Sequence, residues 1–288
     1  MSSAVFSTSA AQGRPFVFDS ENEAEVCPQA ELFTELRPPQ RVSATFPGAL
    51  KDARLVGVTP ASRLAVRPTP EMVSSGIAAM DALTGGLPRG CLTEICGPAS
   101  SGRSTLMLSA LSAATRRGEY CAVVDASDSL DPQSLAAAGI ELDRLLWVRC
   151  GKNSPQAEHC LEQLLRTTDL LLESGGFGMI ALDLGDLPPQ TARRIPLATW
   201  FRFRRAVEPT PTVLLAVERQ SIAGSCSSLL IKLASLKPST SEKASSTPTH
   251  AQLLTEIEIT AELVRSRMDR KPVRSAEITF ASKTAWAG

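Results

Sequence analysis

The chain has 288 residues, of which 43% are hydrophobic and 21% charged, and 30 basic and 30 acidic side chains give a formal net charge of zero. A chain of this size can bury a sizeable core. Neutrality excludes a global field that would attract nucleic acid or a membrane, so any such contact requires a local patch. Segment 19–35 is acidic, whereas segments 193–205 and 265–274 are basic.

The seven cysteines and two histidines do not have the spacing of a metal site. No C-x-x-C pair occurs, Cys91 and Cys96 are the closest cysteines, and His159 and His250 are far apart. We therefore expect reduced, buried thiols rather than a zinc site or disulfide framework, and a surface position for His159. The sequence has no leader pattern and no apolar run of membrane-spanning length, so we predict a cytoplasmic protein without a membrane partner.

Composition divides the chain into an extension, one domain and a tail. Residues 1–70 are Ser/Ala-rich at the start and punctuated by prolines further on, which predicts a partly disordered tether. Residues 71–280 are expected to form a single domain, in which the Ser/Thr/Pro-rich stretch 237–250 is predicted to be a mobile loop. Residues 281–288 are expected to be a C-terminal tail.

The domain alternates helical and apolar segments in chain order. A tight turn is expected at 85–90. Continuous apolar runs such as Met-Ile-Ala-Leu before Asp183 indicate strands buried on both faces, hence an α/β fold with a mostly parallel sheet covered by helices. The last strands should be antiparallel. The predicted helices are 76–83, 102–117, 132–138, 154–173 and 189–207, and the predicted strands are 91–96, 121–125, 145–148, 179–183, 212–217, 229–236, 255–264 and 275–280.

The loop between strand 91–96 and helix 102–117 has the glycine spacing of a phosphate-binding loop, G-x-x-x-x-G-K-[ST]. In such a loop, successive backbone N–H groups and the N-terminus of the following helix surround a polyphosphate. The predicted cofactor is therefore ATP or ADP with Mg²⁺. The residues expected to bind it are Gly97, Pro98, Ala99, Ser100, Ser101, Gly102, Arg103, Ser104, Thr105 and Asp183.

Two of these residues are the predicted magnesium ligands, and a third departs from the motif. Ser104 supplies the hydroxyl, and Asp183 ends an apolar strand where an acidic residue could hold Mg²⁺ through water. Arg103 stands where the motif has lysine. Because guanidinium is planar and favours two-pronged contacts, whereas ammonium is compact, this exchange argues against efficient hydrolysis.

Residues 76–105, which contain Gly-Gly-Leu-Pro-Arg-Gly and Gly-Pro-Ala-Ser-Ser-Gly-Arg-Ser-Thr, resemble the RecA recombinase signature. The likeness continues through Cys-Ala-Val-Val-Asp-Ala at 121–126 and Leu-Asp-Pro at 130–132, and through 139–146. It returns near 265–268 and 275–280. The resemblance implies a RecA-like P-loop core.

The departures from the RecA pattern gather at its nucleotide site. Ser127 takes the place of the glutamate that activates water in that family, and Ser134 takes the place of the aromatic residue that stacks on adenine. Segments 184–190 and 221–227 are much shorter than the family's DNA-binding loops. With Arg103, these changes imply a degenerate ATPase, and no catalytic residue is assigned.

A short RecA-like chain with these features resembles the ImuA branch, whose members accompany translesion polymerases in the DNA-damage (SOS) response. This implies an accessory protein that contacts the translesion polymerase complex and RecA itself, with weak DNA contact at most. One alternative is an ATP-binding RecA-type recombination or repair ATPase in which Asp128 replaces Ser127. Another is an interaction protein similar to a cell-division inhibitor.

Six further residues are interface candidates. Arg265 and Arg267 match the basic pair that, in the resembling family, reaches a neighbouring subunit's phosphates. Trp286 could anchor a partner or fold back onto the core. Two interpretations exist for the helix around residue 200. Its arginines could contact DNA, or they could face water while its apolar stripe packs on the sheet, and the i, i+3 and i+7 spacing of the stripe favours the second. The arginines are Arg202, Arg204 and Arg205, and the stripe is Trp200, Phe203 and Val207.

Overall fold

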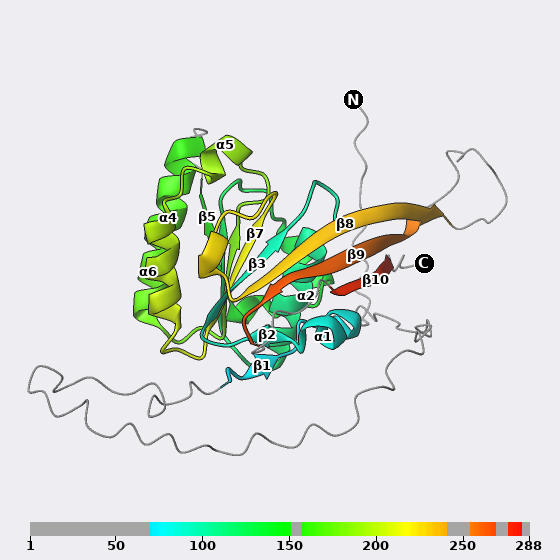
Figure 1. The fold of residues 1–288 in the computed structure, drawn as a ribbon, viewed down its shortest axis with the longest axis horizontal. Helices are drawn as coiled ribbons and strands as arrows, with labels where there is room; N and C mark the ends of the chain where they lie inside the picture. Colours follow the sequence, from blue (N-terminus) through cyan, green and yellow to red (C-terminus); the bar gives the residue numbers. More distant parts are fainter. Residues whose placement is uncertain (1–68, 151–156, 241–253, 269–275, 284–288) are drawn as a thin grey trace, which may run out of the picture. The chain divides into compact units, whose positions relative to one another are not determined.

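A computed structural model describes residues 69–150, 157–240, 254–268 and 276–283, coloured by sequence in Figure 1. Eight strands form one sheet in the order β10-β9-β8-β3-β7-β6-β4-β5. The strands are β3 (Cys91–Cys96), β4 (Cys121–Asp125), β5 (Leu145–Arg149), β6 (Met179–Asp183), β7 (Val213–Glu218), β8 (Leu229–Thr240), β9 (Leu254–Ser266) and β10 (Ala276–Lys283).

The sheet is parallel from β8 to β5 and antiparallel at its other edge. β3 pairs in parallel with both β7 and β8, and β6 pairs in parallel with β7 and β4, which itself pairs with β5. β9 runs antiparallel to β8 and to β10. The predicted α/β class, with a parallel core and antiparallel C-terminal strands, is confirmed.

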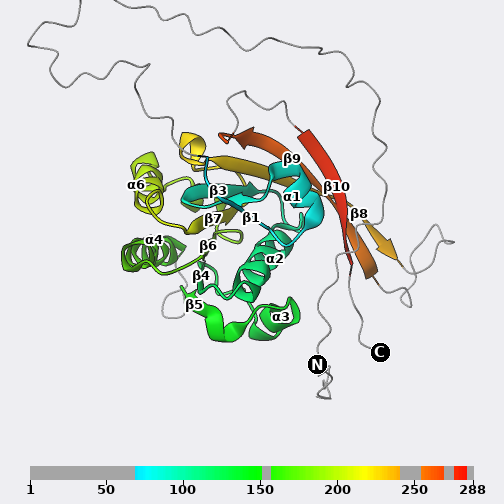
Figure 2. The ribbon, with the colours of Figure 1, turned by 90° about the horizontal axis from the view of Figure 1, so that it is seen from below.

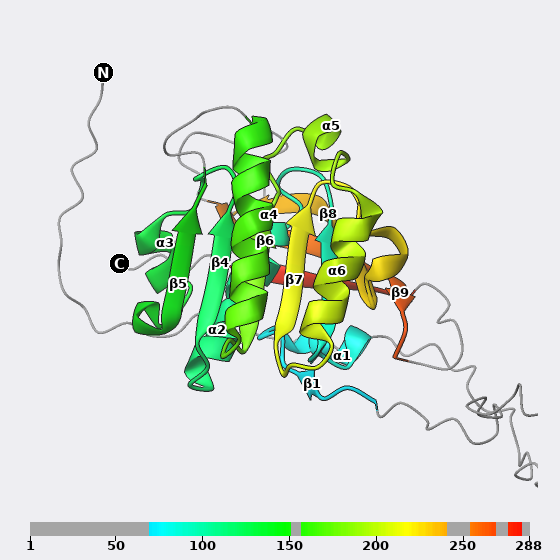
Figure 3. The ribbon, with the colours of Figure 1, turned by 90° about the vertical axis from the view of Figure 1, so that its left-hand side faces the viewer.

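Helices cover both faces of the parallel strands, as Figures 2 and 3 show. On one face lie α1 (Ala78–Thr84), α2 (Arg103–Arg116) and α3 (Pro132–Ala137), and on the other lie α4 (Ala157–Ser174), α5 (Pro189–Ala192) and α6 (Leu197–Val207). Short 3₁₀ turns occur at η3 (Leu142–Arg144) and η4 (Gly224–Cys226).

The buried core is divided by the sheet into two clusters. In β3, Leu92 packs with Trp200 and Phe203 in the cluster under α4 and α6, whereas Ile95 packs with Met107 under α2. Successive strand residues point to opposite faces, and both faces are covered. This explains why the central strands are apolar without alternation.

The single helix predicted over residues 189–207 is wrong. The structure has α5 and α6 instead, with Pro196 as the residue before α6. Pro196 has no backbone N–H to donate, and it disfavours helical geometry at Ile195. The chain therefore bends between the two helices, and α6 lies on the sheet with Trp200, Phe203 and Val207 buried, as predicted.

The antiparallel strands are longer than predicted. β8 continues to Thr240, four residues into the segment predicted as a loop, and it pairs with β9 across a register shift between Ser235 and Pro238. Such an irregularity can accommodate proline in a strand. β10 likewise continues to Lys283, three residues into the predicted tail. Pairing with a strand that is distant in sequence extends these elements, so their ends cannot be predicted from local composition.

Two short strands were not predicted. β1 (Met72–Val73) pairs antiparallel with β2 (Leu87–Pro88), which lies inside the predicted turn 85–90. The rest of loop 237–250, most of extension 1–70 and Trp286 lie outside the described residues. Across the described segments, none of the helices combines the length and hydropathy that a membrane span requires.

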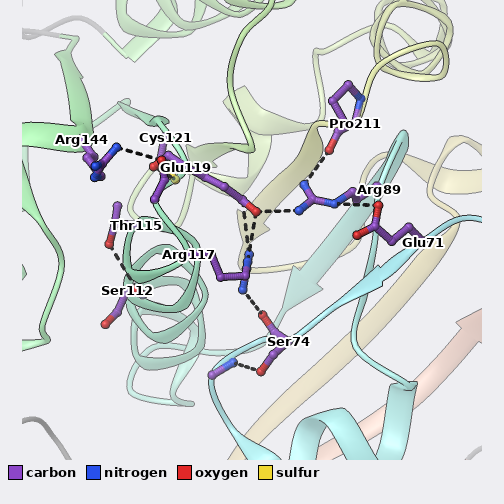
Figure 4. Close-up of polar contacts among 12 residues, drawn as sticks. Glu71, Ser74, Arg89, Ser112, Thr115, Arg117, Glu119, Cys121, Arg144 and Pro211 are labelled. Carbon is purple, nitrogen blue, oxygen red and sulfur yellow. Dashed lines mark hydrogen bonds and ion pairs between the residues drawn. The ribbon is translucent and has the colours of Figure 1, made fainter.

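A polar cluster ties the amino ends of β3, β4 and β7 together (Figure 4). Arg89 Nη2 donates to Glu119 Oε1 at 2.6 Å, and Arg117 Nε donates to the same oxygen at 3.0 Å. Arg89 also donates to the Pro211 carbonyl at 2.8 Å and pairs with Glu71. We call these residues the Glu119 cluster. Burial raises the pKa of Glu119, but the two arginines outweigh burial and hold it below its usual value.

Candidate functional site

The carboxyl ends of β3, β4, β6 and β7 meet at one edge, and residues 97–102 lead from β3 into α2. Both motif glycines are required by geometry. A Cβ on Gly97 would overlap the Leu233 carbonyl of β8, and a Cβ on Gly102 would overlap Ile259 of β9. Gly102 also has φ 88°, a left-handed conformation that favours glycine. Strands β8 and β9 therefore lie directly against this loop.

The loop presents backbone to solvent, as an anion-binding loop would. Pro98, Ala99 and Ser100 are exposed, and Ser100 has φ 59°. The buried Ser101 Oγ has no hydrogen-bond partner among the described residues. The first-turn N–H groups of α2 have no intrahelical acceptor, so they can bind an anion. The backbone thus fits the phosphates of a nucleotide.

Arg103 does not lie as a phosphate-binding lysine would. It is only 7% exposed, and its Nη1 donates to the Gly185 carbonyl, 3.3 Å away, in the turn after β6. Arg219, which follows β7, donates to the same carbonyl from Nε at 2.9 Å. We call this arrangement the Gly185 clamp. Burial lowers the pKa of Arg103, while Asp183 and Asp186 act in the opposite direction, and a guanidinium keeps its charge in a protein.

Asp183 ends β6 directly beside the clamp, as predicted from its position after the apolar strand. Its Oδ1 accepts the Gly185 N–H at 2.9 Å, and its side chain is almost fully buried. Burial raises the pKa of Asp183 to about 6, with Asp125 and Asp186 adding to the effect and the Gly185 N–H and Arg103 opposing it. Its carboxyl group is therefore held at the edge by the Gly185 turn, with the charge of Arg103 nearby.

The loop after β4 carries Ser127, the serine at the water-activating position. Asp125, which is fully buried, accepts backbone N–H groups from Ser127, Ser129 and Leu130 and so fixes this loop. Asp128, the alternative general base, has φ 57° and is held by Arg149 of β5, whose Nη2 lies 2.7 Å from Oδ2. The carboxylate that would serve as general base in the repair-ATPase alternative is therefore already paired with Arg149.

A cleft of about 240 Å³ lies between the start of α2, the β4–α3 loop and the turn after β6. Arg103, Ser104, Asp131, Ser134 and Asp183 are among its lining residues. Ser104 is exposed, so its hydroxyl is available. Ser134 donates its N–H to the carboxylate of Asp131, the N-cap residue of α3, and it offers no ring for stacking. The cleft brings together the predicted loop and Asp183, but not an aromatic platform.

These residues fit a nucleotide through backbone more than through side chains. The N–H groups of Ala99 to Thr105 would hold phosphates, and Ser104 with Asp183 would hold Mg²⁺. A bound phosphate would supply negative charge at the positive end of α2. Arg103 is the exception, because its guanidinium already bonds to Gly185.

Sequence reasoning missed a buried carboxyl pair at the same edge. Glu94 of β3 and Glu218 of β7 are fully buried, and Glu94 Oε1 accepts the N–H groups of Ile222 and Ala223 at 2.6 and 3.0 Å. Burial, together with the neighbouring Glu94, raises the pKa of Glu218 well above its usual value. In the sequence, Glu94 and Glu218 are single charged residues within apolar strands, and nothing indicates that they meet. Apart from its charge, Arg219 has no sequence feature that predicts a role at this site.

The predicted interface residues lie on different surfaces. Arg265 is half-buried and donates to Gly224 and Ser227 of its own chain, while Arg267 is exposed. On α6, Arg202 forms a two-pronged pair with Asp169 of α4, and Arg204 and Arg205 follow in the last turn. Six cysteines in the described parts are free thiols, and those parts contain no group of three or more potential metal ligands.

Comparisons with known proteins agree with this fold. Residues 62–191 match the family model of the RecA N-terminal domain. RecA of Ectopseudomonas oleovorans is 40% identical over 115 residues, which cover 39% of this chain and 31% of that protein. RecA of Gluconacetobacter polyoxogenes is 36% identical over 146 residues, covering 49% of this chain and 40% of that protein. The matches therefore span less than half the length of these relatives.

A solved structure supports the architecture over a wider region. The crystal structure of the RadB recombinase superposes with a TM-score of 0.51 at 19% identity, covering 72% of this chain and 94% of that one. The predicted RecA-like character is thus confirmed in fold, and in sequence over residues 62–191.

Proposed function

We propose that this RecA-like chain is an ImuA-type accessory protein of the DNA-damage response, which acts in translesion synthesis through protein contacts rather than by ATP-driven strand exchange. Its partners would be the translesion polymerase complex and RecA. The proposal joins the resemblance in residues 76–146 to a nucleotide edge whose charged groups bond to the chain's own backbone and side chains. DNA contact would be secondary.

The Gly185 clamp is the observation that carries this proposal. In a P-loop that follows the motif, a lysine stands at the position of Arg103 and binds the terminal phosphates. Here its guanidinium is buried against the turn after β6 and shares an acceptor with Arg219. Arg103 and Arg219 bring positive charge to Asp183 and Asp186, so the edge has an internal source of the positive charge that a bound Mg²⁺ would supply. The chain would then hold its RecA-like shape without nucleotide turnover.

Nucleotide binding without turnover is compatible with this role. The backbone of residues 97–105 keeps an anion-binding form, and the cleft beside it is open. An ATP-binding repair ATPase remains the second candidate because of this cradle. It ranks lower, since Ser127 cannot act as a general base near neutral pH and Asp128 is held by Arg149.

The proposal is tested by ATP hydrolysis and strand exchange with purified full-length protein, with and without single-stranded DNA. We expect no DNA-stimulated hydrolysis and no exchange. In parallel, a fluorescent ATP analogue with Mg²⁺ is titrated against the natural protein, Arg103→Lys and Ser104→Ala. Lysine would release Gly185 and reach the phosphates, so we expect Arg103→Lys to bind about tenfold tighter, the worth of one charged hydrogen bond.

Arg116→Lys is the matched control, because Arg116 is an exposed arginine at the other end of the same helix. Its affinity for the analogue should equal that of the natural protein. DNA-stimulated hydrolysis with strand exchange by the natural protein would contradict the accessory role. So would the absence of binding to both purified RecA and the translesion polymerase subunits.

A further inference from the structure

A buried carboxyl group holds the first half of the loop between β7 and β8. Glu94 Oε1 of β3 accepts the N–H groups of Ile222 and Ala223 at 2.6 and 3.0 Å. The second half of the loop is bound separately, because Arg265 of β9 donates to the 3₁₀ turn η4. Glu94 is therefore the main attachment of residues 219–223 to β3.

A second carboxyl group meets Glu94 at this point. β3 and β7 are parallel neighbours (Figure 1), and Glu218 lies opposite Cys96, two residues beyond Glu94 and on the same face of the sheet. The carboxyl group of Glu94 is within hydrogen-bonding reach of Glu218. Glu94 Oε2 and both carboxyl oxygens of Glu218 are buried and have no hydrogen-bond partner among the described residues. Two ionised carboxylates offer no donor, so these groups can bond to each other only when one is protonated.

Solvent does not compensate this pair. Glu94 and Glu218 are at most 1% exposed, and the hollow beside Glu218 has about 10 Å³, the lower limit for one water molecule. Burial raises the pKa of Glu218, and contact with Glu94 raises it further, while the Ile222 N–H and Arg103 oppose the effect. The packing thus favours the protonated form at a pH where an exposed glutamate would be ionised.

Cations surround the pair without bonding to it. Arg103 and Arg219 donate to the Gly185 carbonyl, and Lys232 of β8 is exposed. The other charged or ionisable groups around the pair are Arg193 after α5, Arg204 of α6, Cys96 of β3, Cys226 of η4 and Asp183 of β6. In the described part of the chain, none of these groups bonds to the three carboxyl oxygens that lack a partner. A proton is therefore the group that can join them.

We propose that Glu94 and Glu218 share one proton that latches residues 219–223 to the sheet, and that the latch opens when this proton is released to solvent. With the proton in place, one carboxyl group donates to the other, and Glu94 still accepts the two loop N–H groups. Without it, two like charges face each other where water cannot enter. Movement of residues 219–223 away from the sheet admits water to both.

The latch is coupled to the Gly185 clamp. Arg219 lies in the latched segment, directly after Glu218, and its Nε donates to the Gly185 carbonyl at 2.9 Å. Opening of the latch would therefore withdraw one arm of the clamp from the turn that holds Asp183. The inference goes beyond the proposed function, because it concerns a proton-dependent movement that requires neither a nucleotide nor a partner protein.

The direction of the pH effect follows from linkage. In the open loop Glu218 has an ordinary pKa near 4.5, whereas in the closed loop the value is raised. The closed state then binds one proton more than the open state. The latch is complete below about pH 4.5, and the equilibrium for opening rises by about tenfold per pH unit until the raised pKa is passed.

Hydrogen–deuterium exchange of the full-length protein tests the latch, with mass spectrometry of peptides that contain Ile222 and Ala223. Division of each rate by that of an unstructured peptide at the same pH removes the intrinsic pH dependence of exchange. We expect the protection of these amides in the natural protein to fall about tenfold or more between about pH 5 and pH 8. In Glu218→Gln the protection should not change with pH, because the side-chain amide donates to Glu94 as the shared proton does.

Glu94→Gln is the second variant, since its carbonyl oxygen can accept the loop N–H groups while its amide donates to Glu218. Its protection should likewise be independent of pH. Glu162→Gln is the matched control, because Glu162 is an exposed glutamate on α4, and it should follow the natural protein. Asp183 titrates in all four proteins, so its contribution cancels in the comparison.

Three results would overturn the inference. One is a parallel fall of protection in the natural protein and in both glutamine variants, and another is constant protection in the natural protein. The third is an equal fall of protection in β6 of the same samples, because the proton would then stabilise the whole sheet rather than one loop. The accessory role stands or fails separately, since none of these measurements involves ATP, RecA or a polymerase.

Discussion

The two ends of the parallel sheet handle charge in opposite ways. At the amino ends, Glu119 receives hydrogen bonds from two arginines, and its pKa is lowered. At the carboxyl ends, Asp183 and Glu218 are buried, and their pKa values are raised. The first arrangement favours the ionised carboxylate in the folded state, whereas the second opposes it.

This difference separates fold from site. Charges that are paired and hydrogen-bonded stabilise the chain in its folded form, as in the Glu119 cluster. Buried ionisable groups with few hydrogen-bond partners destabilise the fold, and proteins keep them mainly where binding or catalysis needs them. Such groups therefore cluster at functional sites. The Gly185 clamp lies at the second kind of end, and there it partly offsets the cost of Asp183.

The largest expected effect comes from breaking the well-paired end. Glu119→Ala leaves Arg89 and Arg117 without their shared acceptor, and Arg89 is largely buried. We expect a loss of about 2–3 kcal/mol in the free energy of unfolding at pH 7, measured by urea denaturation. Because the pKa of Glu119 is lowered, its stabilisation is present above about pH 4.5, the unfolded value, and is lost as pH falls through the lowered pKa.

Glu141→Ala is the control for this change, because Glu141 pairs with Arg144 on the surface with half of its side chain exposed. Exposed pairs contribute at most about 1 kcal/mol. If both variants lost the same free energy, the Glu119 cluster would be no more than a surface ion pair, and the contrast between the two ends would fail.

Much of the fold could be predicted because its signals are local. The apolar runs ending at Asp125 and Asp183 identified buried parallel strands, and the period of Trp200, Phe203 and Val207 identified the packed face of α6. Errors arose where a distant partner decides the structure. β8 continues past Pro238 because β9 pairs with it. A second error was local: the prediction of one helix over 189–207 followed the apolar period and missed the break at Pro196.

The site was predictable at the level of loops and not at the level of side-chain direction. Glycine spacing located the loop between β3 and α2 that we propose to bind phosphate, and a strand-end position located Asp183. Nothing in the sequence shows that Arg103 turns towards Gly185, or that Arg219, 116 residues later (219 − 103), shares its acceptor. Glu94 and Glu218 become neighbours only when β3 and β7 pair.

A smaller effect is expected from relieving the poorly paired end. The pKa of Asp183 is raised from 3.8 to about 6 in the folded chain. The protonated form is therefore favoured by folding, and the associated stability is complete below pH 3.8 and is lost as pH rises to about 6. Asp183→Asn removes this titration. We expect the stability of the variant relative to the natural protein to rise by about 2 kcal/mol between pH 4 and pH 7.

Asp143→Asn is the matched control, since Asp143 is an exposed aspartate in η3, at the opposite end of the sheet strands. Its pH profile of unfolding should run parallel to that of the natural protein. Parallel profiles for Asp183→Asn as well would mean that the carboxylate is solvated in solution, and the two ends of the sheet would then differ less than the structure indicates.

The smallest effect concerns the clamp itself and needs a double-mutant cycle. Arg103 and Arg219 donate to one carbonyl, so either can satisfy Gly185 when the other is removed. Arg103→Met and Arg219→Met together should therefore cost more than the sum of the single changes, by about 0.5–1 kcal/mol. Urea denaturation of the four proteins measures this coupling.

Arg219→Met with Arg144→Met is the control cycle, because Arg144 bonds to Gly118 and Glu141 at the amino end. Additivity in both cycles would mean that the two arginines act independently. The carboxyl end would then have no internal substitute for the positive charge of a bound Mg²⁺.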